Sequence, residues 1–281
     1  MRWRRGMGES CILLDMRSLP DNPPAPDPRP VFGGVAETYD RIRPAYPHQA
    51  VDDLIDFAQP QTGDRMLEVG AGTGKATVLF AGRGLDVVAL EATPEMAEVA
   101  RRNCEGFADV SVRTCAFEDW QEESQAGSFR LLLSAQSWHW IPVDRCALAH
   151  RALMPGGSLA VLWNTTTWPD PQLRHRLEDV YQSLAPTLTL GGPPTDHWLA
   201  EMTDSGLFNS PRRLDYRFEV AYPIGQYLEL IGTYSDHLVL DPESRRSLLD
   251  GVAEAVGSSG DSSGAVRVEY QTRLFLARRV G

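Results

Sequence analysis

The stretch Met66-Leu67-Glu68-Val69-Gly70-Ala71-Gly72-Thr73-Gly74-Lys75 joins a short apolar run to a turn that has glycine at every second position. The apolar residues predict a buried strand, and the glycines let the backbone turn sharply and approach a ligand that side chains would block. A second apolar run, residues 87–90, ends in Glu91, whose carboxylate can accept hydrogen bonds from both hydroxyls of a ribose. Together these features are typical of the nucleoside-binding half of a doubly wound α/β sheet.

The spacing of the glycines narrows the choice of nucleoside. Dinucleotide-binding turns have Gly-x-Gly-x-x-Gly, and a P-loop needs Ser or Thr after Gly-Lys, whereas Ala76 follows Lys75 here. Glu68 is a poor neighbour for a pyrophosphate but suits a ligand that carries positive charge. S-adenosylmethionine (SAM) has a ribose, a sulfonium and an ammonium, so the pattern predicts a SAM site and disfavours an NAD-dependent oxidoreductase. Its predicted contacts are Glu68, Gly70, Gly72, Gly74 and Glu91.

Beyond the glycine turn, the chain resembles the class I SAM-dependent methyltransferases. The resemblance is to the small-molecule branch that includes trans-aconitate methyltransferase and the methyltransferase type 11 group. It is carried by residues 32–47 (FGGVAETYDRIRPAYP), 134–140 (SAQSWHW) and 153–157 (LMPGG), and it covers about residues 31–280. It is specific for SAM-dependent methyl transfer and weak on substrate. One departure is Arg130, where the family usually has Asp next to the Phe that opens the fourth strand.

The resemblance also assigns further contacts to the cofactor. It implies that Tyr39 and Arg43 fold over SAM, where Arg43 can pair with its carboxylate, although both could simply pack one helix on the sheet. The segment 116–118 resembles the family's adenine-edge segment, although its acid could equally be solvated. The expected contacts with adenine and with the methionine part are Ala92, Met96, Ala116, Phe117, Glu118, Ala135 and Trp138.

A proton must leave the acceptor when its nucleophile is a hydroxyl or a carbon, so we looked for a base. His139 lies just past the fourth strand and titrates in the useful range, but the Trp-His-Trp run recurs in the resembled family regardless of substrate. His237 falls in a predicted covering helix. Tyr46 and Tyr234 are weaker candidates for the base.

The acceptor is predicted to be a small molecule. Five tryptophans follow strand ends or lie in covering segments, and they could wall a pocket for an aromatic, indole or phenol acceptor or simply fill the core: Trp138, Trp140, Trp163, Trp168 and Trp198. A carboxylate acceptor like trans-aconitate would need two or more arginines facing the pocket. A non-catalytic SAM-binding protein is the alternative from another functional class.

The predicted fold is α/β: a doubly wound, mostly parallel, seven-stranded Rossmann-like sheet with helical lid and cap segments. Proline-rich residues 1–30 are expected to form a flexible tail, with translation starting at Met7 or Met16 as an alternative. Residues 31–60 are expected to form lid helices and residues 61–168 the SAM-binding core. Residues 169–281 are expected to add helical cap insertions and antiparallel strands that complete the sheet.

Composition limits the classes of partner. The formal net charge of −11 opposes an electrostatic grip on nucleic acid or on an anionic membrane. No apolar run reaches membrane-spanning length, and the four cysteines and six histidines show no paired metal-ligand spacing. The sequence therefore predicts a cytoplasmic monomer or homodimer without a metal, a membrane anchor or a nucleic-acid partner.

Overall fold

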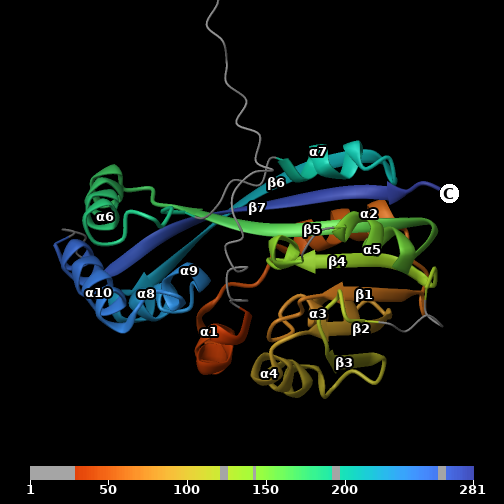
Figure 1. The fold of residues 1–281 in the computed structure, drawn as a ribbon, viewed down its shortest axis with the longest axis horizontal. Helices are drawn as coiled ribbons and strands as arrows, with labels where there is room; N and C mark the ends of the chain where they lie inside the picture. Colours follow the sequence, from red (N-terminus) through yellow and green to blue (C-terminus); the bar gives the residue numbers. More distant parts are fainter. Residues whose placement is uncertain (1–28, 121–125, 142–143, 192–196, 259–263) are drawn as a thin grey trace, which may run out of the picture.

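A computed structural model describes residues 29–120, 126–141, 144–191, 197–258 and 264–281 of the chain. Seven strands form one sheet in the order β3-β2-β1-β4-β5-β7-β6, in which β7 runs antiparallel to both of its neighbours (Figure 1). The mostly parallel α/β sheet predicted from the sequence is confirmed. The strands are Arg65–Val69 (β1), Asp86–Glu91 (β2), Val110–Thr114 (β3), Phe129–Ala135 (β4), Leu153–Thr167 (β5), Phe208–Pro223 (β6) and Ala265–Arg279 (β7).

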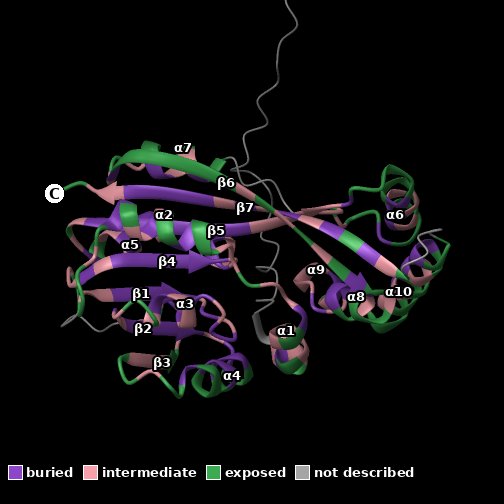
Figure 2. Ribbon diagram, turned by 180° about the vertical axis from the view of Figure 1, so that it is seen from behind, coloured by how far each residue is buried: buried purple, intermediate pink, exposed green. Residues whose placement is uncertain are grey.

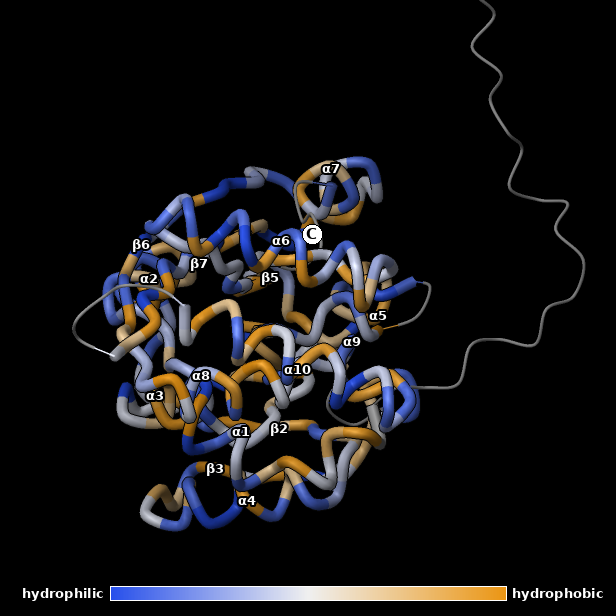
Figure 3. The backbone as a smooth tube through the Cα atoms, turned by 90° about the vertical axis from the view of Figure 1, so that its left-hand side faces the viewer, coloured by the Kyte–Doolittle hydropathy of each residue, from blue (hydrophilic) through white to orange (hydrophobic). Residues whose placement is uncertain are grey.

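Helices cover both faces of the sheet and also form the cap described below. The helices in the described ranges are Arg29–Val35 (η1), Ala36–Ile42 (α1), His48–Ala58 (α2), Thr77–Ala81 (α3), Pro94–Cys104 (α4), Trp138–Trp140 (η3), Arg145–Ala152 (α5), Pro171–Leu184 (α6), His197–Asp204 (α7), Ile224–Ile231 (α8), Ser235–Leu238 (α9) and Pro242–Gly257 (α10). Helices α4 and α7 mix hydrophobic and hydrophilic residues along their length, as helices that cover a core do (Figure 3).

The core has two layers because neighbouring residues of a strand point to opposite faces of the sheet. Leu67 and Leu132 pack on the face that α5 and α7 cover. Met66 and Leu131 pack on the other face, against α2 and α3. Buried residues therefore run almost without interruption along the central strands (Figure 2).

The strands β5, β6 and β7 are about three times as long as β1, and this length builds the cap. Their extensions leave the core and meet α6, α8 and α10 at the far side of the molecule (Figure 1). Tyr222 and Tyr270 come from these extensions, Trp168 directly follows β5, and all three share one buried cluster with the cap helices. The apolar run over residues 159–163 predicts a strand shorter than β5, because the apolar signal fades in Asn164-Thr165-Thr166-Thr167.

Two predicted covering segments lie elsewhere. Helix α2 buries Val51 and Leu54 against the core, so only residues 31–47 of the expected lid remain beside the cap. Helix α7 packs against β6 and β7 through Trp198 and Met202 instead of joining α6 in the cap. Both helices have an apolar face, and the sequence alone does not show which surface of the protein that face covers. The tail predicted for residues 1–30 falls almost wholly outside the described residues.

Candidate active site

The glycine turn lies at the carboxyl end of β1 and is tied to the end of β2. The backbone N–H groups of Gly70 and Ala71 both donate to the carbonyl of Leu90, at 2.8 and 2.9 Å. Gly70 has φ +68°, and a Cβ there would lie 2.4 Å from the Cβ of Ser137. Gly72 has φ +59°, and a Cβ there would enter open space at the wall of a cavity. Close approach of a neighbouring loop therefore requires the first glycine, and left-handed backbone favours the second.

Glu91 is 8% exposed and is held at both carboxylate oxygens. Its Oε2 accepts the N–H of Gly72 at 2.8 Å, and its Oε1 accepts the N–H of Thr93 at 2.8 Å. The acid thus joins the glycine turn to the start of α4, with its carboxylate at the wall of a cavity of about 90 Å³.

This smaller cavity brings together most of the residues predicted for the nucleoside. Its predicted lining residues are Tyr39, Gly70, Gly72, Glu91, Ala92, Met96, Ala116, Phe117, Glu118 and Ala135. Phe32, Gln136 and Ser137 line it as well, although they were not among the predicted contacts, and so does Trp140, which was expected only in the wall of an acceptor pocket. Gln136 and Ser137 follow β4 within the segment 134–140 that carries the resemblance, but no spacing there predicts a cofactor contact for either residue.

A larger cavity of about 410 Å³ adjoins the smaller one and shares Tyr39, Gly72 and Trp140 with it. Core residues from the ends of β1 and β4 form one side, and cap residues from α6, α8 and α9 form the other. It therefore lies between the carboxyl ends of the parallel strands and the cap, where open α/β sheets bind their ligands. Arg43, Glu68, Tyr46, Tyr234, His139 and His237 all line it.

Glu68 provides a test of whether a cationic ligand fits. The side chain is completely buried, its Oε2 accepts the hydroxyl of Thr77 at 2.7 Å, and its Oε1 has no hydrogen-bond partner among the described residues. Burial raises the pKa of Glu68 to about 8. An orphaned carboxylate oxygen beside the glycine turn fits the ammonium of SAM, because a cation there would supply the missing partner.

Arg43 joins the lid to the cap. Its Nε donates to the hydroxyl of Thr233 at 2.8 Å, a second nitrogen donates to the carbonyl of Thr233, and its guanidinium lies 4.3 Å from the ring centre of Tyr234. The guanidinium also lies 5.1 Å from the ring centre of Tyr39. Arg43 thus packs α1 on the cap and not on the sheet, and it also lines the larger cavity, so its pairing with the SAM carboxylate stays a prediction.

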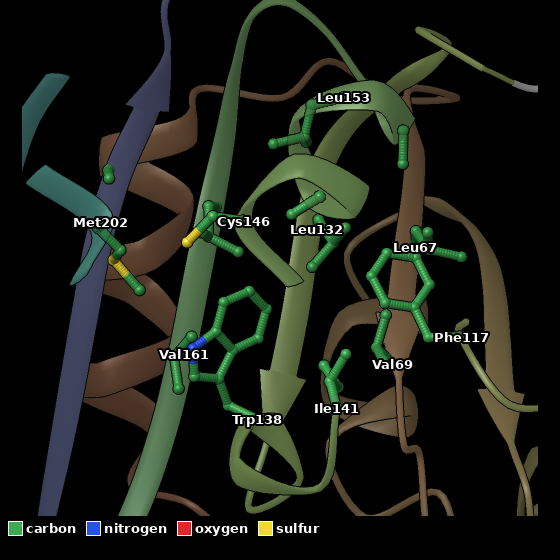
Figure 4. Close-up of a cluster of buried hydrophobic side chains, with 14 of the residues drawn as sticks. Leu67, Val69, Phe117, Leu132, Trp138, Ile141, Cys146, Leu153, Val161 and Met202 are labelled. Carbon is green, nitrogen blue, oxygen red and sulfur yellow. The ribbon is translucent and has the colours of Figure 1, made fainter. Parts of the chain in front are cut away.

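Two predicted cofactor contacts, Gly74 and Trp138, lie outside the lining of both cavities. Gly74 packs toward α4, where an added Cβ would lie 3.4 Å from Ala100. Trp138 is 0% exposed, and Figure 4 shows its indole among Val161, Cys146 and Ile141 in the core.

Trp138 therefore lines neither cavity, and its place behind the methionine part of SAM stays a prediction. Successive side chains of the short helix η3 point in different directions, so Trp138 enters the core while Trp140 faces both cavities. Of the five tryptophans considered for the pocket wall, Trp140, Trp163 and Trp168 line the larger cavity, and Trp198 is a core residue like Trp138.

The candidate bases differ in their surroundings. His139 packs against Trp140 and Trp163, with ring centres 4.2 and 4.7 Å away, and burial and the charge of Arg145 lower its pKa to about 4. It is a neutral and weak base at neutral pH. Burial raises the pKa of both Tyr46 and Tyr234, so these phenols keep their protons.

His237 is 2% exposed and bonded at both ring nitrogens. Its Nδ1 lies 2.7 Å from Oδ1 of Asp236, and its Nε2 lies 2.7 Å from the hydroxyl of Tyr181. Asp236 and Tyr181 line the larger cavity too. No pattern in the sequence points to Tyr181, because α6 and α9 meet only through the fold of the cap.

Within the described ranges, neither a metal-binding group of side chains nor a membrane-spanning helix is present. No cluster of three His, Cys, Asp or Glu residues that could hold a metal ion occurs there. No helix within those ranges has the length and apolar character needed to cross a bilayer.

Comparison with known proteins finds similarity to methyltransferases. A model of a methyltransferase domain matches residues 66–157. An uncharacterized methyltransferase of Mycobacterium tuberculosis is 39% identical over 137 residues, which are 48% of this chain and 52% of that protein. The chain thus aligns with about half the length of these curated relatives. An uncharacterized methyltransferase-like protein of Schizosaccharomyces pombe is 26% identical over 86% of this chain and 92% of its own length.

Among solved structures, phosphoethanolamine N-methyltransferase 2 of Haemonchus contortus, in complex with S-adenosyl-L-methionine, shares the fold. It superposes with a TM-score of 0.53 at 18% identity and covers 89% of this chain and 57% of its own. The residues matched by the domain model include the glycine turn and Glu91, which line the smaller cavity. The chain is therefore similar to methyltransferases over residues 66–157, and it shares the fold of a solved methyltransferase that binds S-adenosyl-L-methionine.

Proposed function

We propose that this protein transfers the methyl group of SAM to a small aromatic acceptor such as a phenol or an indole. The observation that carries the proposal is the pair of adjoining cavities. The smaller one has Glu91 in its wall, and the larger one has aromatic walls and room for an acceptor.

The chain's own residues fit the parts of the cofactor. Glu91 would hold the ribose, Met96 and Phe117 would lie against the adenine, and Glu68 would accept the ammonium. Bound in this way, SAM supplies a methyl group on a cationic sulfur that leaves as a neutral thioether. The protein's main contribution is then to align the acceptor and exclude water, and alignment alone can lower a barrier by several kcal/mol.

The lining of the larger cavity favours an aromatic acceptor over a small polycarboxylate. Its aromatic side chains are Phe32, Tyr39, Tyr46, His139, Trp140, Trp163, Trp168, Tyr181, Tyr227, Tyr234, His237 and Tyr270. Arg43 is the single arginine among its described lining residues, and Thr233 already accepts two of its hydrogen bonds. The lining lysine, Lys75, donates to the carbonyl of Asp40. A tricarboxylate would need more cationic groups facing it.

The test has a binding step and a turnover step. Calorimetric titration with SAM, S-adenosylhomocysteine and NAD should show binding of the first two only. Incubation with SAM and a panel of phenols, indoles and small polycarboxylates, followed by mass spectrometry, should then show one added methyl group on an aromatic compound. Methylation of polycarboxylates instead would overturn the acceptor class. Tight SAM binding without turnover on any acceptor would favour the non-catalytic alternative.

A further inference from the structure

Tyr181, His237 and Asp236 form a continuous hydrogen-bonded chain on the cap side of the larger cavity. Tyr181 lies on α6, and the other two residues lie on α9. The hydroxyl of Tyr181 is 2.7 Å from Nε2 of His237, whose Nδ1 is 2.7 Å from Oδ1 of Asp236. All three residues line the cavity that we assign to the acceptor.

The chemistry of the partners fixes the direction of each hydrogen bond. An ionised carboxylate can only accept, so Nδ1 of His237 carries the hydrogen that Asp236 receives. Although burial opposes ionisation, the hydrogen bonds from His237 hold the pKa of Asp236 below its usual range. In the neutral imidazole Nε2 then has a lone pair, and it accepts the O–H of Tyr181.

This arrangement leaves the oxygen of Tyr181 able to accept a further hydrogen bond. Its own hydrogen points to His237, so its lone pairs are available to a hydroxyl in the cavity. The Asp236 end of the hydrogen-bonded chain reaches solvent, because the side chain of Asp236 is 42% exposed whereas that of His237 is 3% exposed. A proton could thus enter at the buried end and leave near the surface.

We propose that Tyr181, His237 and Asp236 are a proton relay that takes up the hydroxyl proton of a phenolic acceptor. The inference rests on the proposed function and names the group that deprotonates the acceptor. As the acceptor oxygen bonds to the transferred methyl group, its proton moves to the oxygen of Tyr181, and the original Tyr181 proton moves to Nε2. The relay ends with an imidazolium that Asp236 stabilises, and Tyr181 is again a neutral phenol. General base catalysis of this kind contributes roughly 10²- to 10⁴-fold in rate.

A purely structural tie between α6 and α9 would use the same three residues. It would keep the same hydrogen-bond directions, but it would not change the ionisation of a bound phenol. The rings of Tyr181 and Tyr234 both pack on the imidazole, with centres 5.5 and 5.4 Å away. Two measurements test the relay, and the second one distinguishes it from a structural tie.

The first measurement needs no acceptor. Nitrogen-15 NMR of the full chain, with the His237 signals assigned by comparison with His237→Gln, reports which ring nitrogen is protonated. The relay requires hydrogen on Nδ1 and a lone pair on Nε2 at neutral pH. Hydrogen on Nε2, in either the other neutral form or a resting imidazolium, would overturn the relay because the nitrogen could not take the Tyr181 proton.

The second measurement uses 4-nitrophenol as probe, with the protein saturated with S-adenosylhomocysteine so that no methyl transfer occurs. The phenolate absorbs at longer wavelength than the phenol, so the spectrum reports the ionisation of the bound probe. We expect the apparent pKa of the bound probe to be lower in the wild type than in Tyr181→Phe, with Asp236→Asn between them. An unchanged pKa in Tyr181→Phe would overturn the relay.

Tyr222→Phe is the matched control. Tyr222 is a 4% exposed phenol of the same cap cluster, its hydroxyl pairs with that of Tyr270 at 2.9 Å, and it does not line the larger cavity. The Tyr222→Phe variant should lose a buried hydroxyl but leave the apparent pKa of the bound 4-nitrophenol unchanged. Failure of the wild type to bind any phenol would count against the proposed acceptor class, and the NMR measurement would still decide the relay.

Discussion

One carboxylate oxygen of Glu91 accepts the backbone N–H of Gly72 at 2.8 Å. The end of β2 and the glycine turn after β1 are therefore joined at the point where a ribose is expected. The second oxygen accepts the N–H of Thr93 at 2.8 Å, so the carboxylate is fixed in place by the protein alone. A group held in this way loses little conformational entropy when a ligand binds.

Replacing Glu91 should therefore affect cofactor binding strongly. Glu91→Ala should weaken SAM binding by roughly 1.5–3 kcal/mol, because it removes charge-assisted hydrogen bonds to the ribose. Isothermal titration calorimetry measures the change. Glu98→Ala is the matched control, since Glu98 is an exposed acid on the neighbouring helix α4 outside both cavities. Unchanged affinity in the Glu91 variant would refute the ribose assignment.

The cofactor side of the site could be predicted because its signals are local. Glycines at a strand end and an acid at the end of the next strand occupy fixed places in a parallel sheet, and β1 and β2 pair directly. The relay could not be predicted in the same way. Tyr181 and His237 are 56 residues apart, and only the packing of α6 near α9 brings them together.

Neighbouring aromatic residues show another limit of the sequence. Trp138 and Trp140 lie in one Trp-His-Trp run, yet one is a core residue and the other lines both cavities. Hydropathy is the same for both, and only the geometry of the turn after β4 separates them. The length of β5 was missed for a related reason, because its cap portion contains polar residues that pair with β7.

Substitution of these two tryptophans should give opposite results. Trp138→Ala should lower the free energy of unfolding by about 3–5 kcal/mol, since it leaves a cavity in the core. The folded fraction should still bind SAM with nearly normal affinity. Trp140→Ala should cost less stability and weaken binding more. Denaturant titration and calorimetry measure the two effects, and a loss of affinity confined to Trp138→Ala would support its predicted role beside the methionine part.

His139 should make the protein sensitive to acid. Its pKa is lowered from an ordinary value of 6.5 to about 4 by burial and by the charge of Arg145. Between these values the unfolded chain binds a proton that the folded protein does not, so stability is lost as pH falls from about 6.5 to 4. Urea titration at pH 7 and pH 4.5 measures the drop in the free energy of unfolding between the two pH values. This drop should be smaller by roughly 1–3 kcal/mol in His139→Asn than in the wild type.

The surface variant His175→Asn serves as the control for this acid effect, because the side chain of His175 is 77% exposed. If His139→Asn and the wild type lose the same stability between the two pH values, burial of His139 does not explain the acid sensitivity.

Glu68 should release a proton when SAM binds. Burial raises its pKa from 4.5 to about 8, so the carboxyl is mostly protonated at pH 7 in the free protein. An ammonium beside Oε1 favours the ionised form, and binding should therefore expel up to about one proton. Calorimetry in buffers of different ionisation enthalpy counts this proton. The count should fall toward zero above pH 9 and in Glu68→Gln.

The chemistry of the ligand provides the control for Glu68. S-adenosylhomocysteine has the same ammonium without the sulfonium and should release the same proton, whereas methylthioadenosine lacks the ammonium and should release none. Without ligand, the raised pKa contributes stability that is present below pH 4.5 and lost as pH rises through about 8. Glu68→Gln should therefore be more stable than the wild type at pH 9 and should lose this pH dependence. Equal proton release with methylthioadenosine would place the ammonium elsewhere in the cavity.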